Sequence, residues 1–167
     1  MSFIKNKDLI SKAIKQLKAI APKEKTKITH VCGTHEMTAS RFGIRSIIPK
    51  AIEIIPGPGC PVCVCPSYEI DFAIELAKQG KIIATFGDML KVPATKHSLA
   101  EIKRDGYDIR VVYSPNDAIK IAKKNPEKEV VFLAIGFETT APMTAAAISS
   151  EPPQNFSVLS AHRLTIP

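Results

Sequence analysis

The sequence contains no long apolar run and no apolar leader. Its longest apolar stretches, such as residues 130–136, fall far short of the roughly 20 residues that a membrane-spanning helix needs. The first residues, Met1-Ser2-Phe3-Ile4-Lys5, lack the apolar core of a signal peptide. We therefore predict a cytoplasmic protein with no membrane partner. Its 45% of apolar residues are enough for an ordinary buried core.

Acidic and aromatic residues are scarce in the N-terminal segment. Residues 1–27 contain eight lysines against Asp8 and Glu24, so this segment carries +6 of the formal net charge of +7. No aromatic side chain lies between these lysines, although surfaces that bind nucleic acids commonly combine basic and aromatic residues. The pattern favours a solvated helix face and predicts no nucleic-acid partner, with an acidic protein surface as the alternative.

Segments typical of strands and of helices alternate along the chain. Strands are predicted at about residues 26–31, 51–55, 81–86, 109–113, 130–135 and 156–159, and helices at about 6–20, 34–47, 67–79, 98–105, 115–125 and 141–150. The first of these helices is amphipathic and is predicted to cover a core. Three helix starts carry their own signals, namely Ser67 as an N-cap, Ser98 with Glu101 as a capping box, and Ser114 followed by proline. Strands that alternate with helices in this way form parallel sheets through right-handed crossovers. We predict an α/β fold, a Rossmann-like parallel sheet flanked by helices. One domain would cover residues 1–125, and residues 126–167 would begin a second, incomplete α/β domain.

Cysteine is rare, and all four cysteines lie on two predicted loops. Three are found within residues 56–66, a stretch rich in proline and glycine, and the fourth, Cys32, follows the first predicted strand. Loops that follow parallel strands meet at one edge of a sheet. The residues predicted to share a crevice at that edge are Cys32, Cys60, Cys63 and Asp88. In a reducing compartment these spacings indicate metal or redox chemistry more than a disulfide framework.

Three kinds of site remain open from the residues alone. Cys32-x-x-His35 and Cys60-x-x-Cys63 have the ligand spacing of a structural zinc site. A thiol-disulfide oxidoreductase would use Cys60 and Cys63, although the next predicted helix opens several residues beyond them, which weakens activation by its dipole. An open iron site would use the Cys32 thiolate as a soft ligand, with His35 and Glu36 as a proton donor or as groups that orient the ligand.

A further polar stretch, Glu138-Thr139-Thr140, lies at a predicted helix start. Either its side chains cap that helix, or free backbone N–H groups at this position bind an anion. By contrast, His30 and His97 are interpreted as ordinary hydrogen-bonded histidines.

Four motifs occur in a fixed order along the chain. They are Cys32-Gly33-Thr34-His35-Glu36, Gly57-Pro58-Gly59-Cys60-Pro61-Val62-Cys63, Phe86-Gly87-Asp88 with Val92-Pro93, and Gly136-Phe137-Glu138-Thr139-Thr140-Ala141-Pro142. Together they resemble the HypD family of hydrogenase maturation proteins, and the resemblance covers the chain from about residue 5. Family members are much longer. The resemblance implies that their remaining half carries the cysteines of a 4Fe-4S cluster, which are absent from this chain.

The resemblance implies an assembly scaffold with redox-active thiols rather than a turnover enzyme. HypD-like proteins hold iron together with a small HypC-type chaperone while carbon monoxide and cyanide are added, the cyanide coming from a HypE-type partner. The finished Fe(CN)2CO unit passes to the large subunit of NiFe hydrogenase. The same resemblance therefore predicts iron as the bound metal and these proteins as partners.

The resemblance also assigns roles to individual residues. Cys32 would be an iron ligand that shares the metal with a partner cysteine, and His35 would be its neighbour in the cleft. Cys60 and Cys63 would be the redox-active pair that exchanges electrons with the cluster. The other residues assigned to cofactor binding are Glu36, Asp88, Glu138, Thr139 and Thr140.

Overall fold

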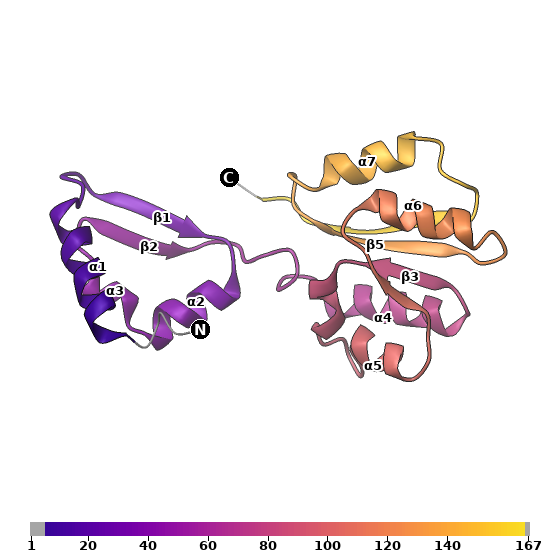
Figure 1. The fold of residues 1–167 in the computed structure, drawn as a ribbon, viewed down its shortest axis with the longest axis horizontal. Coiled ribbons are helices and arrows are strands. Elements are labelled where there is room, and N and C mark those ends of the chain that lie inside the picture. The colour runs from indigo at the N-terminus through magenta and orange to yellow at the C-terminus, as the bar shows by residue number, and fades with distance from the viewer. Residues whose placement is uncertain (1–5, 166–167) are drawn as a thin grey trace. The chain divides into compact units, whose positions relative to one another are not determined.

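The computed structural model describes residues 6–165 and confirms an α/β fold with parallel sheets flanked by helices (Figure 1). The stretch Met1-Ser2-Phe3-Ile4-Lys5, on which the prediction about a signal peptide depends, lies outside the described residues. Within residues 6–165, no helix is both long enough and apolar enough to cross a bilayer.

The strands form two sheets, and the chain divides into two compact units after residue 60. Unit 1 covers residues 1–60 and contains the pair β1 (Thr26–His30) and β2 (Ile52–Pro56). Unit 2 covers residues 61–167, and its strands lie in the order β4 (Ile109–Val111), β3 (Ile82–Thr85), β5 (Val130–Gly136), β6 (Phe156–His162). Because β5 pairs directly with β3, strands β5 and β6 extend the sheet that β3 and β4 begin. The division thus differs from the predicted boundary between residues 125 and 126.

Residues 6–60, the described part of unit 1, combine the β1-β2 pair with three helices. These are α1 (Lys7–Ala19), α2 (Gly33–Arg41) and α3 (Ile44–Ile47). The two strands are parallel, and their ladder ends with His30 opposite Pro56. The single helix predicted over residues 34–47 is interrupted because Gly43 adopts a left-handed conformation with φ 57°. This break turns the chain between α2 and α3.

Unit 1 has almost no fully buried residue. Among residues 6–60, only Ala39 is buried, and Ile28 and Phe42 are 49% and 48% exposed. Helix α1, predicted to cover a core, has no buried residue. It lines an apolar cavity of about 450 Å³ together with α2 and α3, formed by Ile10, Ala13, Ile14, Leu17, Thr38, Phe42, Ile44, Ile47 and Ile48. A pair of strands with short helices is too small to enclose a core of its own.

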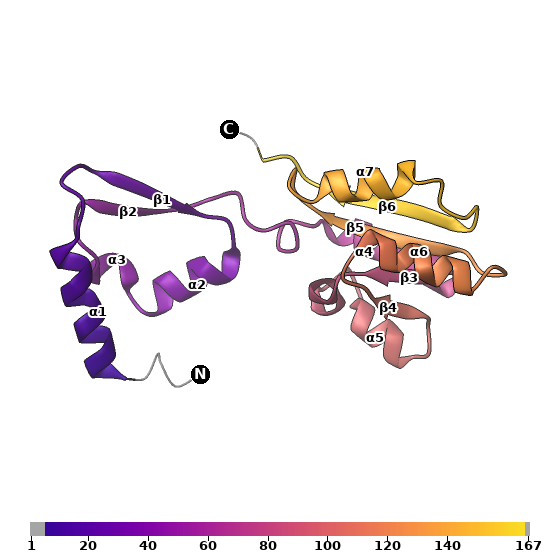
Figure 2. The ribbon, with the colours of Figure 1, turned by 45° about the horizontal axis from the view of Figure 1, so that its top comes forward.

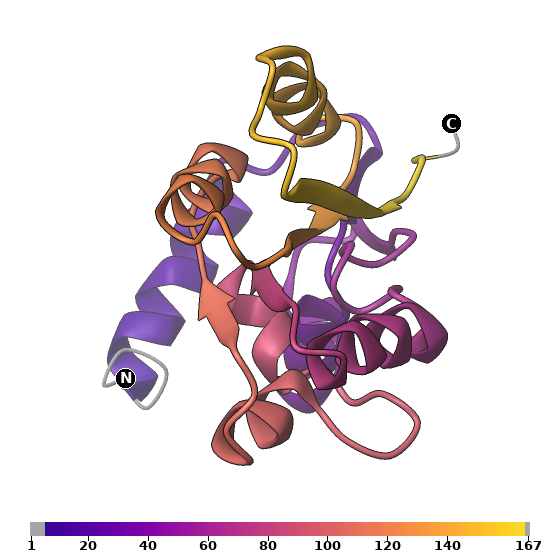
Figure 3. The same cartoon turned by 90° about the vertical axis from the view of Figure 1, so that its right-hand side faces the viewer.

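Unit 2 is a four-stranded parallel sheet with helices on both faces (Figure 2; Figure 3). One face is covered by α4 (Ser67–Lys78) and α5 (Leu99–Arg104), and the other by α6 (Pro115–Lys124) and α7 (Ala141–Ser149). A short 3-10 helix, η2 (Gly87–Lys91), follows β3. Phe132 on β5 is fully buried and meets the ring of Phe86 edge to face at 5.6 Å. The parallel arrangement places the loops after β3, β5 and β6 at one edge of this sheet.

Local sequence signals in unit 2 are mostly confirmed. Ser98 and Glu101 form the predicted capping box at the start of α5, and Ser114 caps α6, with proline next in the chain. Helix α4 begins at Ser67 without a side-chain cap, so the predicted capping role of Ser67 is not found. Strand β6 runs to His162, beyond the predicted end at residue 159, because it pairs with β5 along its whole length.

Candidate metal and thiol site

Cys32 lies between the end of β1 and the first turn of α2. It is the N-cap residue of α2, with an extended backbone (φ −149°, ψ 129°). Its thiol makes no capping hydrogen bond of good geometry, but the Thr34 hydroxyl and the N–H groups of Thr34 and His35 are close enough to favour a thiolate. These groups lower the pKa of Cys32, as expected for a thiol at the positive end of a helix.

Gly57 brings the second cysteine-bearing loop against the end of β1. Its N–H donates to the carbonyl oxygen of His30 at 2.8 Å, and a Cβ at residue 57 would lie 2.6 Å from that oxygen. Only glycine fits so close an approach. Further along this loop, the sulfur of Cys60 lies within 4.8 Å of the sulfur of Cys32. Contact with Cys60 further lowers the pKa of Cys32. Two thiols at this separation can bind one soft metal ion.

Cys63 continues the same loop at the start of unit 2. Only Pro61 and Val62 separate Cys63 from Cys60, residues 61–64 form a turn, and the Cys63 side chain is exposed. The next helix, α4, begins only at Ser67. The Cys-x-x-Cys motif therefore lies on a turn and not at a helix N-terminus, where disulfide oxidoreductases commonly carry an activated thiol.

The surroundings of Cys65 raise its thiol pKa, whereas those of Cys32 lower it. The half-buried thiol of Cys65 donates to Glu69 Oε2 at 3.5 Å, while Arg163 Nη2 donates to Glu69 Oε1 at 2.6 Å. Burial, followed by the negative charge of Glu69, raises the pKa of Cys65 to about 11. Cys65 therefore stays a protonated thiol near neutral pH.

The pH dependence of the alkylation rate should distinguish Cys32 from Cys65. Because the thiolate is the reacting form, we expect Cys32 to reach half of its maximal rate below pH 9.0 and Cys65 only near pH 11. Iodoacetamide pulses followed by peptide mass spectrometry measure both rates. Glu69→Gln should speed the reaction of Cys65 by removing the nearby negative charge, whereas the control Glu53→Gln should leave it unchanged. Identical pH profiles for Cys32 and Cys65 would contradict these assignments.

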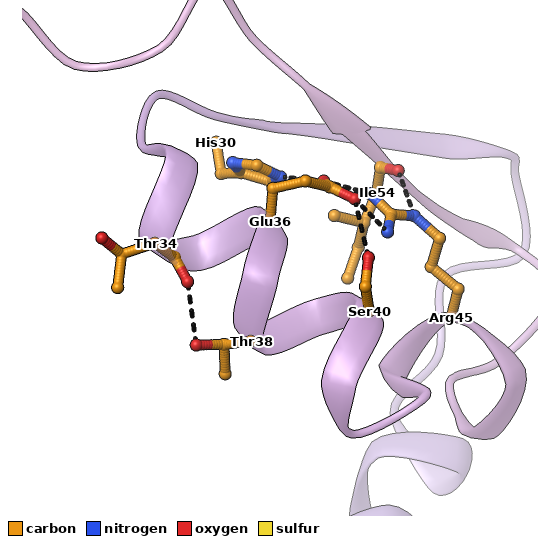
Figure 4. Close-up of polar contacts among 7 residues, drawn as sticks. All are labelled: His30, Thr34, Glu36, Thr38, Ser40, Arg45 and Ile54. Carbon is orange, nitrogen blue, oxygen red and sulfur yellow. Dashed lines mark hydrogen bonds and ion pairs between the residues drawn. The ribbon is translucent and has the colours of Figure 1, made fainter. Parts of the chain in front are cut away.

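The carboxylate of Glu36 connects β1, α2 and α3 (Figure 4). Arg45 donates twice, from Nη1 to Oε1 at 2.9 Å and from Nη2 to Oε2 at 2.7 Å. His30 Nε2 donates to Oε2 at 2.9 Å, and Ser40 Oγ donates to Oε1 at 3.1 Å. Arg45 and then His30 lower the pKa of Glu36 to about 2, so the carboxylate is ionised at neutral pH. Both oxygens of this predicted cofactor-binding residue are thus engaged within unit 1, and His30 is confirmed as a hydrogen-bonded histidine.

His35 is exposed on the first turn of α2. Its ring lies edge to face with that of His30, with centroids 6.0 Å apart. Both rings line a largely apolar cavity of about 350 Å³, whose other lining residues are Ile28, Thr38, Ala39, Ile44 and Ile54. Among the described residues, the ligand atoms that gather around Cys32 are sulfur atoms, and no nitrogen of His35 joins them. Within unit 1 the zinc ligands predicted from the sequence are therefore represented together by the sulfur atoms of Cys32 and Cys60.

The other predicted site residues lie on unit 2. Asp88 is on η2, directly after β3, and residues 138–140 connect β5 to α7. Because β3 and β5 are neighbours, these two loops leave the same edge of the sheet. The structure thus divides the candidates between the units. Cys32, His35, Glu36 and Cys60 belong to unit 1, and Cys63, Asp88, Glu138, Thr139 and Thr140 belong to unit 2.

The loop between β5 and α7 is folded back onto its own strand. A Cβ on Gly136 would lie 2.4 Å from the Cβ of Thr140, so this position needs glycine. Glu138 accepts hydrogen bonds from the N–H of Thr165 at 2.7 Å and from its hydroxyl at 3.1 Å. Its own N–H and that of Thr165 lower the pKa of Glu138. Thr140 is the N-cap of α7 but its side chain makes no capping bond, so side-chain capping by this residue is not found.

The contacts of two arginines with these carboxylates could not be predicted from the sequence. Arg45 lies nine residues after Glu36, outside the spacings of three or four that predict contacts on one helix. It reaches the carboxylate because Gly43 turns the chain between α2 and α3. Arg163 is separated from Glu69 by 94 residues, and only the folded sheet brings the two together.

Comparison with known proteins gives one consistent family. The HypD family model, described as "Hydrogenase formation hypA family", matches residues 8–167. The chain is 49% identical over 168 residues to a hydrogenase expression/formation protein of Methanocaldococcus jannaschii, covering 98% of this chain and 47% of that protein. It is 46% identical over 162 residues to the hydrogenase maturation factor HypD of Rhodobacter capsulatus, covering 95% of this chain and 42% of the relative.

A third relative is the hydrogenase maturation factor HypD of Escherichia coli. The identity is 43% over 145 residues, which cover 84% of this chain and 39% of the relative. The chain therefore spans less than half the length of the curated relatives that it matches.

Proposed function

The chain belongs to the HypD family of hydrogenase maturation factors, and from this premise we propose that it holds iron during assembly of the Fe(CN)2CO centre of NiFe hydrogenase. Iron is here the cargo of the protein, received and later passed on. The proposed role is that of a cytoplasmic scaffold with redox-active thiols rather than of an enzyme with many turnovers.

The observation that carries the proposal is the sulfur pair of Cys32 and Cys60 in unit 1. The two sulfur atoms lie within 4.8 Å of one another, and the surroundings of Cys32 favour its thiolate. Thiolate is the soft ligand that iron bearing diatomic ligands accepts. We propose that Cys32 is the iron ligand and that the Cys60 sulfur beside it helps to hold the same ion.

Cys60 and Cys63 have a second role in this proposal. Oxidation of the two thiols to a disulfide releases two electrons and two protons, and only two residues separate Cys60 from Cys63 along the chain. In longer family members a 4Fe-4S cluster would exchange these electrons. His35, exposed beside Cys32 on α2, is proposed to move a proton near the metal.

The proposal includes three partners. A small HypC-type chaperone would supply a further cysteine ligand to the iron, and a HypE-type protein would donate cyanide. The large subunit of NiFe hydrogenase would receive the finished unit. Asp88 and residues 138–140 lie at one edge of the unit 2 sheet. We propose that they take part in binding the Fe(CN)2CO unit.

Infrared spectroscopy tests the iron-holding role. The chain is purified without air together with the small chaperone and the cyanide donor, and stretching bands of iron-bound CN and CO are recorded. We expect Cys32→Ser to abolish these bands and the control Cys65→Ser to retain them, because burial and the neighbouring Glu69 keep the Cys65 thiol protonated. Bands of equal intensity in Cys32→Ser would refute the assigned ligand.

A structural zinc site is the second candidate, because unit 1 has so little core of its own. Only Ala39 is buried among residues 6–60, and small units of this kind are commonly stabilised by a metal. This candidate predicts one zinc per chain after purification without added metal, and unfolding of unit 1 by a chelator. The iron scaffold predicts a unit 1 that keeps its helical signal in the chelator.

A further inference from the structure

The separation of the Cys32 and Cys60 sulfur atoms depends on how strands β1 and β2 are held together. Cys32 follows the end of β1 and Cys60 follows the end of β2. These strands share a ladder of five residue pairs, and no third strand joins them among residues 6–60. Two strands with no buried core are only marginally stable in water. Contacts outside the ladder must therefore contribute to the positions of both cysteine-bearing loops.

Arg45 makes such contacts to both strands (Figure 4). Its Nε donates to the carbonyl oxygen of Ile54 on β2 at 3.2 Å. Its two terminal nitrogens hold Glu36, and the same carboxylate accepts from His30 Nε2, the last residue of β1, at 2.9 Å. One guanidinium group thus connects β2, α3, α2 and β1 in a continuous set of hydrogen bonds, which we call the Arg45 clamp.

We propose that Arg45 is a positioning residue, and that the Arg45 clamp sets the distance between the Cys32 and Cys60 sulfur atoms. His30 lies two residues before Cys32, and Glu36 lies on the helix that Cys32 caps. Ile54 lies on the strand that leads to Cys60. Paired charge-assisted hydrogen bonds from a planar guanidinium fix both distance and orientation, which a flexible ammonium group does not.

The clamp differs from an ordinary surface ion pair. The Glu36 side chain is 35% exposed, and each of its oxygens accepts two hydrogen bonds. Lys25 and Glu53, by contrast, form a single contact of 3.1 Å with exposures of 69% and 42%. Exposed pairs of that kind contribute little to structure. Lys25→Met is therefore a matched control, because it also removes a cation from an ion pair with a residue on β2.

Disulfide trapping measures the sulfur separation directly. The full chain carries Cys63→Ser and Cys65→Ser, so that only Cys32 and Cys60 can react. Diamide oxidises this pair, with two S–H bonds broken and one S–S bond formed, and diamide itself takes up both electrons and both protons to become a hydrazine. The rate is followed by quenching with acid and counting free thiols by mass spectrometry.

We expect Arg45→Met and Glu36→Gln each to slow trapping by about tenfold, because small losses of positioning strongly reduce the rate of an intramolecular reaction. Lys25→Met should leave the rate within twofold. The double variant should be no slower than Arg45→Met alone, because both changes break the same set of bonds. Far-UV circular dichroism shows whether the helices persist. Unchanged trapping in Arg45→Met with helices retained overturns the proposal.

Arg45→Lys decides the matter if Arg45→Met fails to fold. Lysine keeps the charge and the apolar stem but cannot make two parallel bonds to Glu36. A folded Arg45→Lys variant that traps slowly supports the clamp, and one that traps at the parent rate overturns it. Glu36→Asp should recover part of the rate lost in Glu36→Gln, since it restores a charged acceptor.

Only the consequence for iron rests on the proposed function, because trapping is measured without metal. If Arg45→Met slows trapping while iron affinity is unchanged, the clamp stands and the assigned iron site falls. If trapping and iron affinity are both unchanged, the clamp itself falls.

Discussion

Replacing Gly57 with valine is expected to separate the two cysteine-bearing loops and to weaken iron binding by about tenfold, equivalent to ~1.4 kcal/mol. The N–H of Gly57 donates to the His30 carbonyl at 2.8 Å, and an added Cβ would lie only 2.6 Å from that oxygen. The atom that the side chain would meet is backbone, so the loop has to move. Forced overpacking of this kind commonly costs about 1–3 kcal/mol.

Separate measurements on the two units show whether Gly57→Val affects unit 1 alone. The protein has no tryptophan, and its three tyrosines, Tyr68, Tyr107 and Tyr113, all belong to unit 2. Tyrosine fluorescence during urea unfolding therefore reports unit 2 alone and should be unchanged. Hydrogen exchange of the β1 amides should accelerate, and titration with ferrous iron gives the affinity. Gly87→Ala is the control, because its Cβ would meet nothing closer than 3.5 Å. Iron affinity equal to that of the parent would refute the role assigned to Gly57.

Replacing Phe132 with alanine is expected to lower the free energy of unfolding of unit 2 by about 3–5 kcal/mol. Phe132 lies on the central part of β5, has no exposed surface, and packs edge to face against Phe86 at 5.6 Å. It belongs to the core between the sheet and helices α6 and α7. The change removes a large apolar side chain and leaves a cavity that the surrounding strands cannot close.

Tyrosine fluorescence in urea measures this loss of stability. Phe72→Ala on α4 is the matched control, because Phe72 is 54% exposed and its removal should change the unfolding free energy by less than about 0.5 kcal/mol. Equal unfolding midpoints for Phe132→Ala and Phe72→Ala would contradict the assigned core. Gly136 and the loop that carries residues 138–140 follow β5, so Phe132→Ala should also accelerate hydrogen exchange there.

The sequence predicted the elements whose signals are local. The Ser98–Glu101 capping box and Ser114 followed by proline are read from adjacent residues, and each begins a helix in the structure. The alternation of strands and helices likewise predicted the α/β class. The division of the strands into two sheets was not predicted, because it depends on which distant strands pair. The pairing of β5 with β3 places strands β5 and β6 in the sheet of unit 2.

The candidate site was predictable only where chain topology brings residues together. Cys32 and Cys60 each follow one of two paired parallel strands, so their convergence needs only that pairing. The partners of Glu36 and Cys65 could not be inferred in this way. Arg45 reaches Glu36 through the left-handed turn at Gly43, and Arg163, which follows β6, reaches Glu69 on α4 across 94 residues of sequence. Such contacts depend on the path of the folded backbone and not on spacing along the sequence.

Iron-edge X-ray absorption of the chain loaded with ferrous iron in the absence of air tests the central claim most directly. If Cys32 and Cys60 hold one iron between them, the spectrum shows an iron–sulfur shell. That shell should weaken in Cys32→Ser and in Cys60→Ser and stay intact in Cys65→Ser. A spectrum that shows only oxygen and nitrogen neighbours, or the same sulfur shell in all four proteins, contradicts the account.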